Sequence, residues 1–138
     1  MDPITVLGAT AAASQLFQQG LVITKFLWEL YSKGQEVPEL IRRHIADVDQ
    51  ITKLAKLIKQ NPSLNHESIA SALNSCLAVT EPFQTMLQKL SSGDQDGKFV
   101  RLQKAVLVVL NEKEIARFFE DLERVKSSLT ISIQNVDS

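Results

Sequence analysis

Apolar residues recur at intervals of three and four along most of the chain, and this spacing is typical of amphipathic α-helices. Over the stretch 3–32, one stripe with this spacing consists of Ile4, Leu7, Ala11, Phe17, Leu21, Thr24, Trp28 and Tyr31, interrupted by Ser14. The stripe is widened by Leu16, Ile23, Leu27 and Leu30. Asp2 suits an N-cap and Pro3 the first helical turn, so we expect a helix from about Pro3 to Ser32.

The same periodicity predicts two further helices, over about 38–60 and 66–90. The apolar face of the first consists of Leu40, Ile41, Ile45, Val48, Ile51, Leu54, Ala55 and Ile58. The buried face of the second is expected to consist of Ile69, Leu73, Cys76, Leu77, Thr80, Phe83, Leu87 and Leu90. Asn65 is the expected N-cap of this second helix, and Pro82 inside it should kink or split it near Glu81.

Two more helices are expected in the last third of the chain, over 98–110 and 112–134. The end of the first, 105–110, is also compatible with a buried strand, but a lone strand would have no partner. Because loops of a few residues join long amphipathic helices, the sequence predicts an all-α, up-and-down bundle of four to five helices. We expect one helical bundle domain over 1–134, with 135–138 as the start of a linker or the edge of an expressed fragment.

Composition limits the class of protein. The 138 residues have a formal net charge of −1 and are 44% hydrophobic, as in an ordinary globular domain. The near-neutral net charge gives no excess of basic residues of the kind that binds nucleic acid, so we expect no nucleic-acid partner. Cys76 is the single cysteine, which excludes a disulfide within the chain, and its apolar neighbours predict a small buried side chain.

Residue patterns that indicate catalysis or cofactor binding are weak in this sequence. His44 and His66 have no Cys or second His at ligand spacing, which argues against zinc. The polar segment 92–103 lacks carboxylates at the first and last places of a calcium loop. The sequence contains neither the GxxxxGK(S/T) motif of P-loops nor the GxGxxG motif of dinucleotide-binding folds. We therefore expect no metal, no cofactor and no enzyme; catalysis by Cys76 would need a histidine brought close by the fold.

The stretch 3–24 contains no charged side chain, although 22% of the chain is charged. It lacks the positive start and continuous apolar run of a signal peptide, and it is too polar for a conventional transmembrane span. Small residues four apart, Gly8–Ala12 and Ala9–Ala13, let helices approach closely. Two readings follow from the residues: a helix packed in the centre of the bundle, or one that leaves it, self-associates and enters a bilayer.

Three long stretches of the chain resemble one family. They are MDPITVLGATAAASQLFQQGLVITKFLWELY, LYSKGQEVPELIRRHIADVDQITKLAKLI and RLQKAVLVVLNEKEIARFFEDLERVKSSLTISIQ. The first opens with Met-Asp-Pro and continues into a helix rich in small residues. Together they resemble the fungal HeLo-like and SesA-type domains, the N-terminal domains of NOD-like receptors and related death effectors. Many members carry a tryptophan near the KAVLVVL segment, where this chain has none; its tryptophan is Trp28.

The resemblance implies a non-enzymatic, all-α domain that executes programmed cell death, as in fungal heterokaryon incompatibility, by targeting and permeabilising membranes. It implies a cytoplasmic resting state, self-association triggered by a nucleotide-binding receptor or an amyloid motif outside this chain, and insertion into plasma-membrane lipid. Carried onto this chain, the inserting helix spans 4–24. Its apolar contacts are Ile4, Val6, Leu7, Leu16 and Phe17, and its packing positions are Gly8, Ala9, Ala12 and Ala13. The alternative is a signalling adaptor bundle that binds protein partners without entering a membrane.

Overall fold

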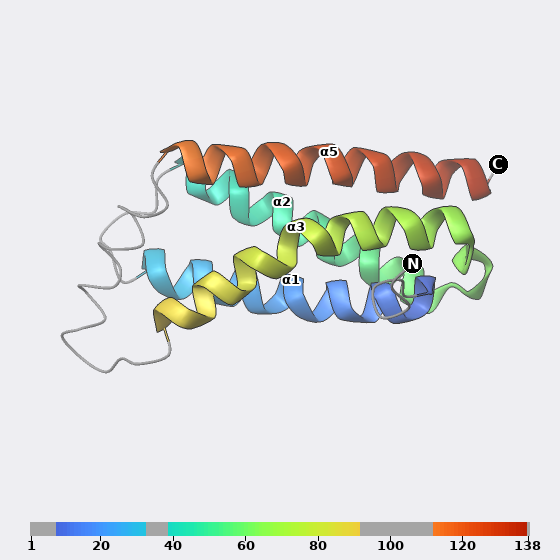
Figure 1. The fold of residues 1–138 in the computed structure, drawn as a ribbon, viewed down its shortest axis with the longest axis horizontal. Coiled ribbons are helices and arrows are strands. Elements are labelled where there is room, and N and C mark those ends of the chain that lie inside the picture. Colours follow the sequence, from blue (N-terminus) through green and yellow to red (C-terminus); the bar gives the residue numbers. More distant parts are fainter. Residues whose placement is uncertain (1–7, 33–38, 92–111, 138) are drawn as a thin grey trace.

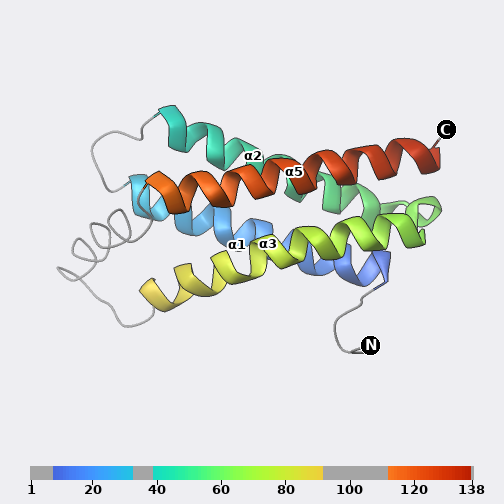
Figure 2. The same cartoon turned by 45° about the horizontal axis from the view of Figure 1, so that its top comes forward.

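The computed structural model describes residues 8–32, 39–91 and 112–137, which form four long α-helices and one short 3₁₀ turn. The helices are α1 (Ala9–Ser32), α2 (Glu39–Gln60), α3 (Glu67–Ser91) and α5 (Glu112–Asp137), and the turn between α2 and α3 is η1 (Pro62–Leu64). Figures 1 and 2 show α1, α2 and α3 running in alternating directions along the long axis, with α5 antiparallel to α3. The predicted all-α, up-and-down bundle is therefore confirmed. The helix predicted over 98–110 lies outside the described residues.

The four helices surround one apolar core. Helix α1 packs against α2 and α3, α3 packs against α5, and a narrower contact joins α2 to α5, so α1 and α5 occupy opposite corners. Every helix contributes to the core, and the largest apolar side chains with almost no exposure are Leu16, Ile23, Val48, Ile51, Ile58, Ile69, Leu73, Leu122 and Leu129. Burial of these residues supplies the main driving force for the fold.

Helix α1 presents a different face to the core from the stripe that the sequence emphasised. Leu16, Ile23 and Leu27 are buried, whereas Leu21 and Trp28 of the first stripe are 48% and 45% exposed. The buried face is completed by small residues, which are weakly hydrophobic and so contribute little to a pattern of apolar positions. Because small side chains let neighbouring backbones approach, this face of α1 packs more closely than its hydrophobicity predicts.

Most helix ends agree with the sequence to within a few residues, but α1 begins at Ala9, six residues after the expected start at Pro3, and the described residue before it, Gly8, is not helical. Helix α3 is capped by His66 and not by Asn65, because Nδ1 of His66 accepts a hydrogen bond from the Ser68 backbone N–H at 3.1 Å. It also continues unbroken through Pro82, so the expected split is wrong, although Figure 1 shows its second half slanting away from its first. Helix α5 runs to Asp137, past the predicted end at 134.

Candidate functional site

The sequence-predicted site residues fall into three groups. Ile4, Val6 and Leu7 lie outside the described residues. Gly8 is exposed just before α1, and its carbonyl accepts the first hydrogen bond of the helix from Ala12 at 2.8 Å. The remaining members, Ala9, Ala12, Ala13 and Leu16, are fully buried in the core, while Phe17 is partly buried at its edge.

Helix α1 approaches α2 closely at Gly20. A Cβ atom at this position would overlap the Thr52 hydroxyl oxygen of α2. That hydroxyl donates to the Val48 carbonyl oxygen within α2 at 2.8 Å, so it needs no partner from α1. Glycine is therefore required at position 20 by the space between two helices, since Thr52 is short and β-branched and has little freedom to move aside.

Among the described residues, a buried hydrogen bond between side chains joins α1 to α3. The Thr80 hydroxyl donates to Oε1 of Gln19 at 2.6 Å, and both side chains are buried. A hydrogen bond of this kind contributes about 1 kcal/mol, but a buried group left without its partner costs about 1–3 kcal/mol. The contact therefore fixes the rotation of α1 about its own axis, because turning the helix would leave both groups unsatisfied.

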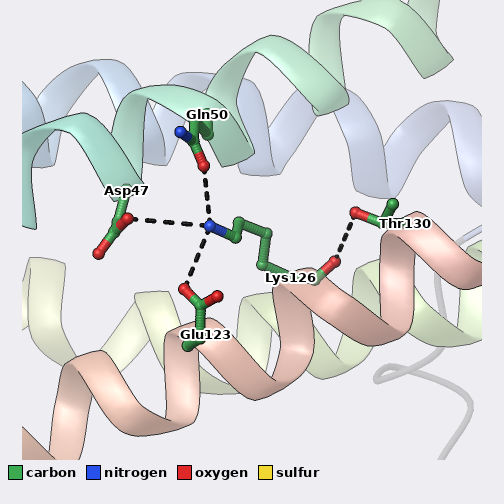
Figure 3. Close-up of polar contacts among 5 residues, drawn as sticks. All are labelled: Asp47, Gln50, Glu123, Lys126 and Thr130. Atoms are coloured by element: carbon green, nitrogen blue, oxygen red, sulfur yellow. Dashed lines mark hydrogen bonds and ion pairs between the residues drawn. The ribbon is translucent and has the colours of Figure 1, made fainter.

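A lysine joins α5 to α2 on the opposite side of the bundle. Figure 3 shows the Lys126 ammonium of α5 between three oxygen acceptors: Gln50 Oε1 at 2.8 Å, Glu123 Oε2 at 3.1 Å and Asp47 Oδ1 at 3.8 Å. The Lys126 side chain is only 17% exposed, so water screens it less than the surface pairs. The Thr130 hydroxyl also donates to the Lys126 carbonyl oxygen at 2.9 Å. Lys126 therefore links α5 to α2 across their narrow contact through an ion pair and a hydrogen bond.

An aromatic cluster joins α5 to both α2 and α3. The His44 ring stacks on Phe119 with centroids 3.7 Å apart and planes 8° apart, and Phe83 stacks on Phe118 at 3.8 Å. His44 is buried, and its Nδ1 atom has no hydrogen-bond partner. Burial lowers the pKa of His44 below its ordinary value of 6.5, against a smaller opposing effect of the Asp47 carboxylate. The ring is therefore held in its neutral form.

Cys76 is a packed side chain of the apolar core. Cys76 is buried in the core, as predicted, and its thiol donates weakly to the Val125 carbonyl oxygen at 3.7 Å. Burial raises the pKa of the Cys76 thiol to about 12, which keeps it protonated and a poor nucleophile at neutral pH. In the part of the chain that the structure describes, no group of three or more His, Cys, Asp and Glu side chains is arranged to hold a metal ion.

Several of these residues were missed by the sequence reasoning, although the spacing contained a signal for each. His44 lies four residues before Val48, and Gln19 lies four before Ile23, so both belong to the buried stripes of their helices. Thr52 likewise lies four residues after the buried Val48. Polar residues at apolar positions of a helix are the signal, because a buried polar group needs a partner and so marks a specific contact.

Comparison of the chain with protein families, curated proteins and solved structures finds no match. Within the described helices, none combines the length and the apolar character needed to cross a membrane.

Proposed function

We propose that this chain is a membrane-targeting, cell-death execution domain of a fungal immune-receptor or amyloid-signalling system. Its bundle is the cytoplasmic resting state, and clustering by a receptor or an amyloid motif outside this chain releases the N-terminal helix into plasma-membrane lipid. The proposal rests on the resemblance to HeLo-like and SesA-type domains and on one observation: α1 keeps an uncharged segment, Ala9–Thr24, with its small and apolar face sequestered.

The absence of charge matters because a charged side chain near the bilayer centre costs about 2.5–3.5 kcal/mol on insertion scales. Segment 9–24 of α1 therefore avoids the largest penalty for transfer from the bundle to lipid, while Lys25 and Glu29 follow it in the same helix. Its three glutamines, Gln15, Gln18 and Gln19, still need hydrogen-bond partners there. In an assembly of several copies they would pair with one another or line a water-filled interior, so self-association and insertion support each other. The buried Gln19–Thr80 bond and the Gly20–Thr52 approach hold the helix in the bundle until then.

The test is leakage of dye from liposomes, measured after the chain is clustered through an inducible oligomerisation module fused to its C-terminus. The diagnostic variant is Leu21→Glu, because Leu21 is half exposed and a charge there leaves the bundle core intact. We expect induced wild-type oligomers to release dye and Leu21→Glu oligomers to release at least about tenfold less. Ile131→Glu is the matched control, since Ile131 is a similarly exposed leucine-sized side chain on α5.

Leakage that is equally reduced by Ile131→Glu would show a general effect of charge and not insertion of α1. Absence of leakage from wild-type oligomers, together with binding of a protein partner, would favour the signalling adaptor instead. Circular dichroism of both variants before clustering checks that the helical bundle is retained.

A further inference from the structure

The layer formed by α1 and α2 has an outer surface that combines exposed apolar residues with basic ones. On α1, Phe17, Leu21 and Trp28 follow one another at spacings of four and seven residues and so share one side of the helix. Leu21 and Trp28 are exposed and Phe17 is partly so. On α2, the exposed basic residues Arg42, Lys56 and Lys59 lie along the neighbouring side. We call these six residues the cationic–apolar face.

Contacts between α1 and α2 place the two rows next to each other. The Lys59 ammonium lies 5.5 Å from the centroid of the Phe17 ring, directly over it. The close approach of Gly20 to Thr52 brings the two helix backbones together in the middle of the layer. The aromatic and aliphatic side chains of α1 are therefore flanked by the basic side chains of α2 along one continuous side of the bundle.

Charge is distributed unevenly between the two layers of the bundle. Of the acidic side chains described in α2, Asp49 is paired with Lys53 at 3.1 Å and Asp47 faces Lys126 on the α5 side. Asp49 lies seven residues from both Arg42 and Lys56, on the same side of α2, but Lys53 neutralises it there, so this side of α2 keeps a net positive charge. The α3–α5 layer instead exposes both signs, with Glu67 and Glu81 on α3 and with Arg117, Glu120, Glu123 and Arg124 on α5. The net charge of −1 conceals this difference, because it sums over both layers.

We propose that the cationic–apolar face docks the folded bundle on an anionic lipid surface. Basic residues near such a surface are attracted by its negative potential, while a tryptophan and neighbouring apolar side chains are accommodated at the level of the headgroups. A nucleic acid or an acidic peptide would satisfy the lysines but would leave Leu21 and Trp28 against phosphates or water. The inference deepens the proposed function by naming the lipid class and the surface of first contact, and to that extent it rests on it.

Binding to vesicles tests the proposal, with the single tryptophan, Trp28, as a native fluorophore that is excited selectively over Tyr31. Monomeric protein is titrated with vesicles of phosphatidylcholine alone and of phosphatidylcholine with phosphatidylserine. We expect a blue shift of Trp28 emission and sedimentation with the anionic vesicles only, weakened by raised salt. The double variant Lys56→Glu, Lys59→Glu should bind at least about tenfold more weakly, since each basic residue near the surface contributes about fivefold.

The matched control is Arg117→Glu, Arg124→Glu, which makes the same change in net charge with two exposed arginines of α5. We expect this control to keep at least half of the wild-type affinity. Leu21→Ser should weaken binding severalfold, and Ile131→Ser should not. Equal losses in the lysine and arginine pairs would overturn the proposal, as would equal binding to both kinds of vesicle. Binding to a DNA oligonucleotide or polyglutamate without binding to vesicles would assign the face to another polyanion.

Vesicle binding by the monomer tests the docking surface, and dye leakage by the clustered protein tests the proposed function, so the two can fail separately. If monomers dock through the cationic–apolar face while clustered protein fails to leak dye, the proposed execution mechanism fails and the docking surface stands. If clustered protein leaks dye although the monomer does not dock and the lysine pair has no effect, the docking surface fails and the execution mechanism stands.

Discussion

Helices α1 and α5 occupy opposite corners of the bundle and are held there by different kinds of contact. The inner face of α1 carries small and aliphatic side chains, one glycine against Thr52 and one neutral hydrogen bond to Thr80. Helix α5 is held by stacked aromatic rings and by Lys126, which reaches three oxygen acceptors. A charge also contacts α1, since the Lys59 ammonium of α2 lies over the Phe17 ring, but both side chains are at the exposed edge of the bundle, whereas the Lys126 ammonium is largely shielded from water.

This difference determines what each helix must leave behind when it separates from the bundle. Among the described contacts, removing α1 exposes apolar surface, breaks the neutral hydrogen bond between Thr80 and Gln19 and separates Lys59 from Phe17; an apolar environment of lipid or of other copies can replace the lost burial. Removing α5 would separate Lys126 from Asp47 and expose the stacked ring of Phe119. Because α1 packs broadly against both α2 and α3, its removal loses more burial than removal of α5, and only an apolar environment could replace that loss.

The largest expected effect concerns the buried side of α1. Leu16→Ala removes a fully buried side chain and should lower the free energy of unfolding by about 2–5 kcal/mol. Leu21→Ala on the exposed side of the same helix should change it by less than about 0.5 kcal/mol. Urea denaturation followed by circular dichroism measures both. Equal losses in the two variants would mean that α1 does not face the core as described.

The next effect concerns the space between α1 and α2. Gly20→Ser forces a side chain against Thr52 and should destabilise the bundle by about 1–3 kcal/mol through overpacking. Gly8→Ser is the matched control, because no atom lies within 4 Å of a Cβ there and serine is a good N-cap. Thermal melting of the two variants compares them directly. A neutral Gly20→Ser would show that the helices separate at little cost.

The two corners also differ in how far the sequence predicted them. For α5, apolar residues three and four apart predict a buried stripe that includes Phe118, Phe119, Leu122, Val125 and Leu129, and these five are buried, because large apolar residues mark that face clearly. For α1, large apolar residues occur on both sides of the helix, and the buried side is distinguished by Ala9, Ala12, Ala13 and Gly20. Periodicity of hydrophobic residues could not choose between the sides, because the choice depends on how closely α2 approaches.

Polar contacts between different helices could not be predicted from the sequence for a related reason. Ion pairs with a spacing of three or four residues, such as Lys53 with Asp49, follow from helix geometry alone. The contacts of Lys126 with Asp47 and of Thr80 with Gln19 join residues 79 and 61 positions apart, and they depend on which helices become neighbours. The sequence predicted the class of fold, and the pairing of helices determined which polar residues meet.

A smaller effect is expected at the charged contact of α5. Lys126→Met removes the ammonium from Gln50, Glu123 and Asp47 and should cost about 1 kcal/mol at low salt, because the side chain is largely shielded from water. Lys53→Met removes an i,i+4 pair whose lysine is 76% exposed and should cost less than about 0.5 kcal/mol. Urea denaturation at 0.05 M salt, where charges are screened over about 14 Å, and at 1 M salt, where they are screened over about 3 Å, separates the two. If the unfolding free energy of Lys126→Met still depended on salt as strongly as that of the wild type, charged groups other than Lys126 would be responsible.

The smallest effect is a dependence on pH at the aromatic contact of α5. Because burial lowers the pKa of His44 in the folded chain, the unfolded chain takes up the proton first as the pH falls. The contribution of His44 to stability is therefore complete above its ordinary pKa of 6.5 and decreases as the pH falls below that value, until the folded-state pKa is reached. His44→Phe keeps a ring against Phe119 and should remove this loss between pH 7.5 and 5.5. His44→Gln lacks the ring and the charge, so it should be less stable at every pH while losing the same slope. Unfolding free energies of the three proteins across this range distinguish titration from packing, and a slope retained in His44→Phe would show that another group is responsible.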